Sequence, residues 1–250
     1  MAAQNPLCHI AIIGAGPSGL AAAWALRNAP VSVTVFEKSR GFGGRAASRT
    51  RHGARIDPGA NYFKLNDPEV EDLIQNHLPT DELTSFSGEI WTFDKQLRVS
   101  RGDPDQDQEP KWTYRTGIST LGKLLASRLR ANVHRETRIH SLEKTRDDRW
   151  TLHSDAGTPF GPYEHVLFTI PAPQSLEIFK RSSLPSDEIE EVTTFLAPAT
   201  YHRQISLTFG WSDQPAPDVP WYALLNTDRS SDLAWASLEN WKPDRAPRDT

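Results

Sequence analysis

The chain has 250 residues, of which 37% are hydrophobic and 24% are charged. This composition excludes a disordered or fibrous chain, and the length fits one large domain or two small ones. With 28 Lys and Arg against 32 Asp and Glu, the formal net charge is −4, so the overall charge does not indicate a protein that binds polyanions. The single Cys8 cannot form an internal disulfide, and the N-terminus lacks the basic region of a signal peptide, so we expect a cytoplasmic protein.

The first 36 residues predict a strand, a helix and a second strand. Residues 8–13 are an apolar run that ends in glycine, and residues 31–36 alternate β-branched side chains. Residues 17–27 are rich in Ala and Leu and begin with the proline that suits a first helical turn. We expect a right-handed βαβ unit with parallel strands. The apolar stretch 10–26 is too short to span a bilayer and contains Gly and Pro, so we expect no membrane association.

The rest of the chain mixes helices with strands of an antiparallel type. Residues 102–110 are polar and predict a loop. The order of elements favours an α/β nucleotide-binding domain interrupted by an α+β domain of mainly antiparallel sheet. We predict helices at 68–77, 119–130, 174–180 and 186–194, and strands at 88–94, 96–100, 111–115, 132–134, 137–143, 148–153, 165–170, 203–210, 220–225 and 232–238.

Residues 14–19 fit the G-x-G-x-x-G pattern of a dinucleotide-binding loop, placed between the first strand and the first helix. The first glycine allows a tight turn, the second lets a pyrophosphate approach the backbone, and the third lets helix and strand pack closely. Glu37 lies 18 residues past the last glycine, at the end of the second strand, where a carboxylate can accept hydrogen bonds from ribose hydroxyls. The alternative is a glycine-rich turn without a ligand. The residues predicted to hold the dinucleotide are Gly14, Gly16, Pro17, Ser18, Gly19 and Glu37.

Residues 37–45 resemble the second fingerprint of the flavin-containing amine oxidase superfamily, in which Gly-Gly-Arg lies just after the ribose-binding acid. This resemblance implies FAD, with Lys38, Gly44 and Arg45 at the cofactor and Arg45 neutralising the pyrophosphate. Cys8 is not the C-terminal cysteine that carries covalent flavin in monoamine oxidases, so we expect non-covalent binding. The alternative is a nucleic-acid patch, but the basic residues interleave with glycines rather than aromatics, so we expect no nucleic-acid partner. Those basic residues are Lys38, Arg40, Arg45, Arg49, Arg51 and Arg55.

Residues 55–63 are similar to the D-x-G-A-Q-Y-F segment of renalase and its bacterial relatives, with Asn61 where those usually have Gln. The segments 112–114, 137–139, 166–174 and 241–243 resemble parts of the same group in the same order. Ordinary packing in the core is the alternative for Tyr62, Phe63 and each later segment. The resemblance implies that Gly59, Ala60, Asn61 and Tyr62 lie near the flavin ring and that Ile139 and Thr169 lie at the cofactor.

Flavoproteins of this class return at the C-terminus with a Gly-Asp segment that covers the flavin. The only Gly-Asp here is Gly102-Asp103, in a polar loop, and residues 246–250 form a polar tail. We therefore expect a truncated chain in which this return is missing. The expected domains are an FAD-binding domain of the glutathione-reductase type at 1–64 and 117–173, and a substrate domain at 65–116 and 174–250.

The resemblance implies an FAD-dependent oxidoreductase that transfers hydride from a small substrate, with O2 as the acceptor and H2O2 as the product. Wrongly reduced isomers of NAD(P)H are the candidate substrates, and we assign no catalytic base. A flavin amine oxidase or desaturase is the alternative, in which Trp221, Tyr222 and Trp235 line an amine pocket, unless these residues belong to the core. An alternative of another class is a non-catalytic nucleotide-binding or scaffold protein.

No metal site is predicted. Asp103, Asp105, Asp107 and Glu109 alternate like a calcium loop, but Gln108 and Tyr114 occupy the positions that require Gly and Glu. The 8 His residues show no paired ligand spacing, and His134 and His140 are expected to be surface or hydrogen-bonded residues. No G-x-S-x-G is present, so a serine hydrolase is unsupported.

Overall fold

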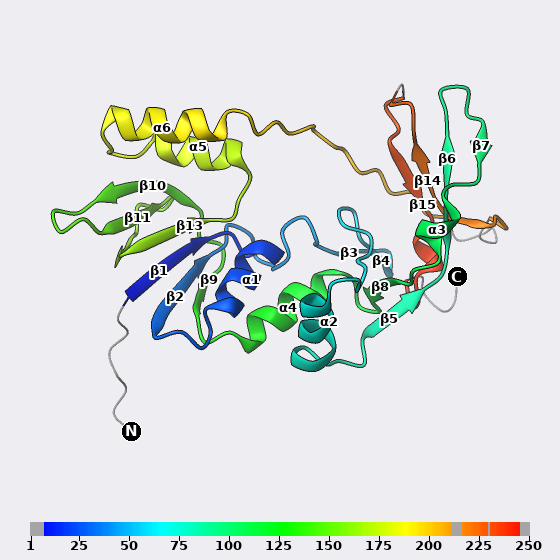
Figure 1. Cartoon of the computed structure of the whole chain (residues 1–250), viewed down its shortest axis with the longest axis horizontal. Helices are drawn as coiled ribbons and strands as arrows, with labels where there is room; N and C mark the ends of the chain where they lie inside the picture. Colours follow the sequence, from blue (N-terminus) through cyan, green and yellow to red (C-terminus); the bar gives the residue numbers. More distant parts are fainter. Residues whose placement is uncertain (1–7, 212–216, 230, 246–250) are drawn as a thin grey trace. The chain divides into compact units, whose positions relative to one another are not determined.

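The computed structural model describes residues 8–211, 217–229 and 231–245 (Figure 1). The chain forms two compact units, each built from two separate stretches of sequence. Unit 1 comprises Met1–Arg45 and Leu121–Ile205, and unit 2 comprises Ala46–Thr120 and Ser206–Thr250. The chain therefore leaves unit 1, forms part of unit 2, and later returns to each of them. The functional domain boundaries expected from the sequence stay a prediction.

Unit 1 contains a four-stranded parallel sheet in the order β13-β1-β2-β9 (Figure 1). β1 (Cys8–Ile13) and β2 (Val31–Phe36) are the central pair, and α1 (Pro17–Ala25) connects them. β9 (Asn132–His134) adds to β2, and β13 (His165–Phe168) adds to β1. The βαβ unit and the α/β fold class predicted from the sequence are thus confirmed.

The core of unit 1 lies between this sheet and a three-stranded antiparallel sheet in the order β10-β11-β12. β10 spans Ile139–Lys144, β11 spans Trp150–Ser154, and β12 spans Pro159–Tyr163. α5 (Ala172–Lys180) packs against β10, and α6 (Ser186–Leu196) packs against α5. Both sheets and α5 contribute to one apolar cluster, whose buried members are Ala11, Ile13, Phe36, Ile139, Leu142, Leu152, Tyr163 and Ile178.

Unit 2 contains a four-stranded sheet and two two-stranded sheets. The four-stranded sheet has the order β15-β14-β6-β7, and β14 runs parallel to β6 although the other neighbours are antiparallel. β3 pairs with β4, and β5 pairs with β8, both antiparallel. The strands are β3 (Arg49–Arg51), β4 (Ala54–Ile56), β5 (Leu83–Phe86), β6 (Glu89–Phe93), β7 (Val99–Ser100), β8 (Lys111–Tyr114), β14 (Trp221–Asn226) and β15 (Trp235–Ser237).

Short helices connect the strands of unit 2. α2 (Pro68–Asp72) continues into a π-helix at Leu73–His77, and a 3-10 turn spans Glu239–Trp241. α4 (Ser119–Arg128) follows β8, and the boundary between the two units falls after Thr120. α3 (Pro104–Asp107) is a single helical turn inside the stretch predicted as a polar loop. The Asp103 carboxylate accepts from Asp105 N at 3.0 Å and caps that turn, which explains why a polar sequence folds into a helix.

The strand predicted at 203–210 is absent, because residues 201–211 form neither helix nor strand. The alternation that favoured a strand is present, yet its apolar side chains face solvent: Ile205 is 89% exposed, Leu207 is 75% exposed and Phe209 is 77% exposed. Alternating side chains indicate a strand only where a neighbouring strand completes the backbone hydrogen bonds. No strand within the described residues pairs with this segment.

The short strands β3, β4, β5 and β12 were not predicted from the sequence. β12 contains Pro159, Gly161 and Pro162, residues that normally argue against a strand. It lies at the edge of its sheet, where a proline that lacks an N–H group is tolerated. β3 and β4 are three residues each and consist largely of charged or small side chains, so no periodic pattern marks them.

Candidate functional site

The glycine loop of unit 1 has the geometry that its pattern predicts. Gly14 has a φ of +110°, and its N–H donates to Phe36 O at 2.8 Å, so the turn after β1 closes against the end of β2. A Cβ on Gly19 would overlap the Gly14 carbonyl oxygen, whereas a Cβ on Gly16 would meet no heavy atom within 4 Å. The first and third glycines therefore permit close packing, and the second leaves open space beside the backbone.

The N-terminus of α1 opens onto this space. Gly16 is the N-cap residue and supplies no side-chain cap, so no side chain accepts from the first N–H groups of the helix. Pro17 has no N–H, and the first free donors belong to Ser18 and Gly19. Aligned donors and the positive end of the helix dipole favour an anion at this position.

Thr169 closes the loop from the side of β13. Its hydroxyl lies 2.9 Å from Ile13 O and 3.2 Å from Gly14 O, so it donates to the backbone of the turn. A Cβ on Gly14 would come within 2.8 Å of this hydroxyl oxygen. Thr169 thus supports the loop from behind, and the prediction that it also contacts a cofactor remains a prediction.

Glu37 is 6% exposed and lies directly after β2. One carboxylate oxygen accepts from Ala15 N and the other from Ser39 N, each at 2.8 Å. Its backbone is fixed as well, because Glu37 N donates to His134 O and Glu37 O accepts from Thr137 N. A carboxylate has about four lone-pair positions, so two of them stay open for the hydroxyls of a ribose.

A hollow in unit 1 begins at Glu37 and continues toward α5. Lys38 lies at its edge, where its ammonium donates to Gln174 Oε1 at 3.0 Å. Ile139 belongs both to this hollow and to the buried core, so it offers an apolar wall. The lining residues are Ile13, Gly14, Phe36, Glu37, Lys38, Thr137, Arg138, Ile139, Ile170, Gln174, Glu177, Ile178 and Arg181.

The double-glycine stretch lies directly on the glycine loop. Gly43 N donates to Ala15 O at 3.0 Å. Gly44 has a φ of +51°, and a Cβ on it would come within 3.3 Å of Gly16 Cα. The exposed Arg45 follows. The two predicted fingerprints therefore form one surface of backbone groups, and the open space at Gly16, the uncapped helix and the Glu37 carboxylate fit the diphosphate and ribose of a dinucleotide.

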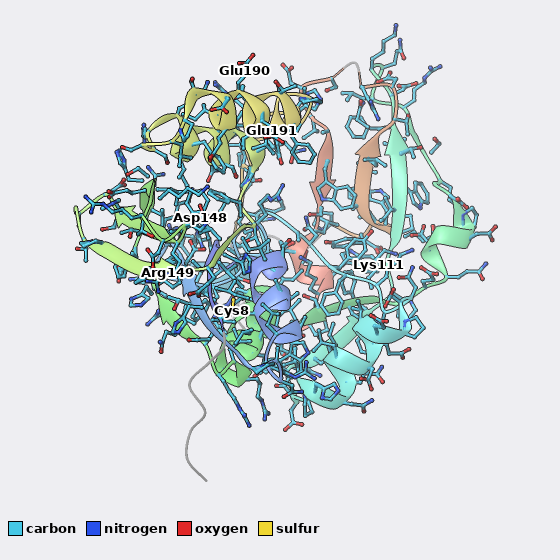
Figure 2. All side chains as sticks on the ribbon, turned by 60° about the vertical axis from the view of Figure 1, so that its left-hand side comes forward. Cys8, Lys111, Asp148, Arg149, Glu190 and Glu191 are labelled. Atoms are coloured by element: carbon cyan, nitrogen blue, oxygen red, sulfur yellow. The ribbon has the colours of Figure 1, made fainter. Side chains whose placement is uncertain are left out.

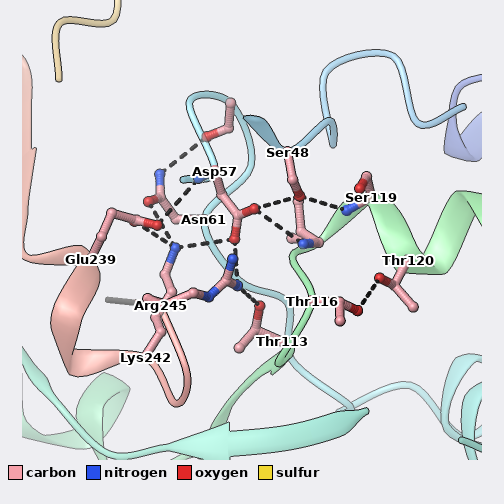
Figure 3. Close-up of polar contacts among 12 residues, drawn as sticks. Ser48, Asp57, Asn61, Thr113, Thr116, Ser119, Thr120, Glu239, Lys242 and Arg245 are labelled. Atoms are coloured by element: carbon pink, nitrogen blue, oxygen red, sulfur yellow. Dashed lines mark hydrogen bonds and ion pairs between the residues drawn. The ribbon is translucent and has the colours of Figure 1, made fainter. Parts of the chain in front are cut away.

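Unit 2 contains a buried ionic cluster centred on Asp57 (Figure 3). The Oδ2 atom of Asp57 accepts from Arg245 Nη2 at 2.7 Å and lies 3.3 Å from Lys242 Nζ. The Oδ1 atom accepts from Ser48 Oγ at 2.7 Å and from Ile118 N at 3.1 Å. All three charged side chains are 0% or 1% exposed. One carboxylate thus joins four segments of unit 2.

Asn61 lies at the edge of this cluster, in the segment predicted to face a flavin ring. Its amide oxygen is 3.4 Å from Lys242 Nζ and 3.2 Å from Tyr222 Oη. Gly59 and Ala60, just before it, are exposed. The structure therefore brings Asn61 and Lys242 together, and this pairing was missed in the sequence, where Lys242 entered only as part of the segment 241–243.

Tyr62 and Tyr222 belong to the apolar cluster of unit 2. The Tyr62 ring meets Phe86 and Tyr222 edge-on, with centroids 6.4 Å apart in each case. Tyr222 is completely buried and packs with Phe86 and Ala223. Burial and the negative charge of Glu239 raise the pKa of Tyr222, so its hydroxyl stays protonated. Tyr222 is thus a core residue with a hydrogen-bond donor at its tip.

Carboxylates of the acidic stretch before β8 form hydrogen bonds and an ion pair within the protein. Asp107 accepts from Ile90 N at 3.0 Å and pairs at 3.0 Å with Lys111, a side chain that is 1% exposed. Lys111 is labelled in Figure 2. In unit 1, His134 stacks on Phe36, and His140 lies 3.3 Å from an Asp155 oxygen. Across residues 8–211, 217–229 and 231–245, no group of three or more His, Cys, Asp or Glu is arranged to hold a metal ion.

Cys8 is partly buried in β1, and burial together with the nearby Glu164 raises the pKa of its thiol. A raised thiol pKa disfavours the reactive thiolate. Cys8 thus behaves as a small packing residue. No helix in the described part of the chain is long and apolar enough to cross a bilayer.

The chain resembles known proteins in sequence over part of its length. Residues 12–76 match the model of the NAD(P)-binding Rossmann-like domain. An L-amino-acid oxidase of Bothrops pauloensis is 34% identical over 111 residues, which cover 42% of this chain and 22% of that oxidase. Protoporphyrinogen oxidase 2 (chloroplastic/mitochondrial) of Arabidopsis thaliana is 42% identical over 68 residues, which cover 27% of this chain and 13% of that protein. The match thus spans about a fifth or less of these relatives.

Solved structures show the same fold. A protein of Exiguobacterium sp. 255-15 assigned as a protoporphyrinogen oxidase aligns with a TM-score of 0.67 over 98% of this chain and 76% of its own, at 16% identity. Putrescine oxidase with bound putrescine aligns with a TM-score of 0.57 over 74% of this chain and 63% of its own, at 15% identity. Residues 12–76 therefore resemble a Rossmann-like nucleotide-binding domain, and the chain shares its fold with these two solved structures.

Replacing Gly19 by Ala is expected to destabilise the protein by about 1–3 kcal/mol, because the new Cβ would overlap the Gly14 carbonyl oxygen. Gly16→Ala is the matched control. Gly16 has a φ of −75° and a ψ of 177°, and a Cβ there meets open space, so the change is expected within about 0.5 kcal/mol. Urea denaturation followed by circular dichroism measures both. Equal losses in the two variants would contradict the packing described here.

Replacing Asp57 by Asn is expected to cost about 3–5 kcal/mol, because Lys242 and Arg245 would keep two buried positive charges without the carboxylate between them. The control is Glu109→Gln, which breaks the exposed ion pair with Lys64 in the same unit and is expected to change stability little. Thermal unfolding of the two variants tests this. A midpoint for Asp57→Asn that equals the wild-type value would show that the cluster is not a source of stability.

Proposed function

We propose that the chain is a renalase-like, FAD-dependent oxidoreductase that takes hydride from a small substrate. The observation that supports this most directly is the docking of the double-glycine stretch on the glycine loop, through Gly43 N to Ala15 O at 3.0 Å. A dinucleotide site that needs only the first loop would not require a second stretch of backbone at the same place. The similarity to an L-amino-acid oxidase supports an oxidase reaction.

Unit 1 is proposed to hold the ADP half of the cofactor. The uncapped start of α1, with the N–H groups of Ser18 and Gly19, would bind the diphosphate, and Arg45 would add a positive charge. The free lone pairs of Glu37 would accept from the ribose hydroxyls, and its charge would repel a 2′-phosphate. The hollow toward Ile139 would take the adenine. In unit 2, Gly59, Ala60, Asn61 and Tyr62 are proposed to contact a flavin ring, and the FAD would be bound non-covalently.

The chemistry that FAD supplies when bound is a two-electron oxidation, in which a hydride leaves the substrate and O2 finally takes the electrons to give H2O2. The residues of the chain would bind FAD and the substrate and orient them relative to each other. A dihydropyridine ring gives up hydride without a protein base, so a wrongly reduced NAD(P)H isomer is the substrate that best suits a site with no assigned base.

An amine or amino acid is the second candidate substrate, and a specific observation favours it: 34% identity over 111 residues to an L-amino-acid oxidase. That match covers 42% of this chain and 22% of the relative. The two candidates are separated by turnover, since purified protein with FAD would release H2O2 with only one class of substrate. Release of H2O2 from amines but not from dihydronicotinamide isomers would overturn the renalase-like proposal. A colourless protein without FAD affinity would favour a non-catalytic scaffold.

Glu37→Gln is expected to weaken FAD binding about tenfold or more, because the amide cannot accept from both Ala15 N and Ser39 N and loses its charged hydrogen bonds to ribose. Quenching of FAD fluorescence measures the affinity. ADP and 2′-deoxy-ADP serve as competitors and provide the control: the wild type should prefer ADP, and Glu37→Gln should lose that preference. An unchanged preference in the variant would show that Glu37 does not contact the ribose.

A further inference from the structure

The side-chain amide of Asn61 is held at both ends. Its oxygen accepts from three donors, which are Tyr222 Oη at 3.2 Å, Lys242 Nζ at 3.4 Å and Ser237 Oγ at 3.4 Å. Its nitrogen donates to Gly59 O, two residues back in the same loop, at 3.1 Å. Figure 3 shows the amide between the loop and the buried cluster. All of these groups belong to unit 2.

This arrangement fixes which end of the amide is oxygen. An ion-paired lysine ammonium can only donate, so the atom that faces Lys242 must be the acceptor. The Gly59 carbonyl can only accept, so the atom that faces it must be the nitrogen. The raised pKa of Tyr222 keeps its phenol protonated, so its hydroxyl also donates to the Asn61 oxygen. In the flipped orientation, the amide NH2 group would face the Lys242 ammonium, and the amide oxygen would face the Gly59 carbonyl oxygen.

Lys242 is in turn fixed by two carboxylates. Its ammonium lies 2.7 Å from Glu239 Oε1 and 3.3 Å from Asp57 Oδ2, and its side chain is 0% exposed. Arg245 shares the same Asp57 oxygen, so Asp57 cannot turn toward Lys242 alone. The ammonium therefore has a defined place next to the Asn61 oxygen, rather than the range of positions open to a surface lysine.

The amide nitrogen carries two hydrogens, and the Gly59 carbonyl takes one of them. Asn61 is partly exposed, and the neighbouring Gly59 and Ala60 are exposed. Within the described residues, Gly59 O is the acceptor that this nitrogen contacts. The second hydrogen thus remains as a directed donor on an accessible loop, held there by groups behind it.

We propose that Asn61 donates this second hydrogen to a carbonyl oxygen of the bound heterocyclic ligand, and that Lys242 is a positioning residue that holds the amide in the required orientation. This inference rests on the proposed function. The flavin ring contains carbonyl oxygens and a dihydronicotinamide carries one on its carboxamide, so the shared chemistry is a carbonyl acceptor in or attached to a nitrogen heterocycle. Asn in place of Gln shortens the side chain by one methylene and sets the reach of the donor.

The orientation is tested without cofactor, by NMR of the 15N-labelled protein. Asn61→Asp removes the amide signals and so assigns them, while it keeps an oxygen toward Lys242. In the wild type, one amide hydrogen is expected to exchange about tenfold more slowly than the other, because only one is bonded to Gly59 O. Lys242→Met should abolish that difference. Lys111→Met is the matched control, since Lys111 is equally buried and ion-paired but does not contact Asn61. A difference that persists in Lys242→Met overturns the positioning role.

The ligand contact is tested with FAD and then with a dihydronicotinamide isomer. If the flavin is the acceptor, FAD shifts the free amide hydrogen, and Asn61→Asp changes the visible spectrum and weakens sulfite binding to the flavin about tenfold. If the substrate is the acceptor, these properties stay constant and Asn61→Asp raises KM about tenfold with little change in kcat.

The outcomes separate this inference from the proposed function. Protein that binds no FAD refutes the proposed function, and the NMR experiment still decides whether Lys242 orients Asn61. Protein that binds FAD, while Asn61→Asp alters neither the flavin properties nor KM, refutes the ligand contact alone. If Lys242→Met does not fold, Tyr222→Phe, which removes one donor from the same oxygen, replaces it in the exchange measurement.

Discussion

The close approach of α1 to the end of β1 is the constraint on which the nucleotide site depends. No side chain fits at Gly19, because a Cβ there would overlap the Gly14 carbonyl oxygen. The helix therefore starts directly against the sheet, and no side chain caps its first N–H groups. The same turn places Ala15 N within 2.8 Å of the Glu37 carboxylate. The positive end of the helix and the negative Glu37 carboxylate are thus held next to each other by this backbone contact.

The second fingerprint adds to this surface by backbone contact alone. Gly43 N reaches Ala15 O, and Gly44 lies against Gly16 in a conformation with φ of +51°. Any side chain at Gly44 would fill the space between the two stretches and would need a strained backbone. Glycines in both stretches therefore serve the same purpose, which is to let the two loops approach each other closely. Arg45 comes directly after the second stretch.

The parts that the sequence predicted are those with local causes. The βαβ unit is marked by apolar runs, a proline at the first helical turn and glycines at fixed spacing, all within about 30 residues. The ionic cluster has no such signal, because Asp57 and Arg245 are 188 residues apart. A charged residue in a sequence looks the same whether it is solvated or buried, and only the fold pairs it. The strand predicted at 203–210 was wrong because an alternating pattern is local, whereas a strand also needs a partner strand that the pattern does not supply.

Stability alone does not explain why unit 2 buries two cations and a carboxylate. Well-packed apolar side chains of similar volume often give equal or greater stability than a buried ion pair, because charges lose their hydration on burial. Apolar side chains cannot, however, tell the two ends of an amide apart. Lys242 can do so, and Asp57 together with Glu239 keeps it beside the Asn61 oxygen. The ionic cluster is therefore best understood as a source of specificity. Its charges lose hydration on burial, and in return they fix one orientation of the Asn61 amide.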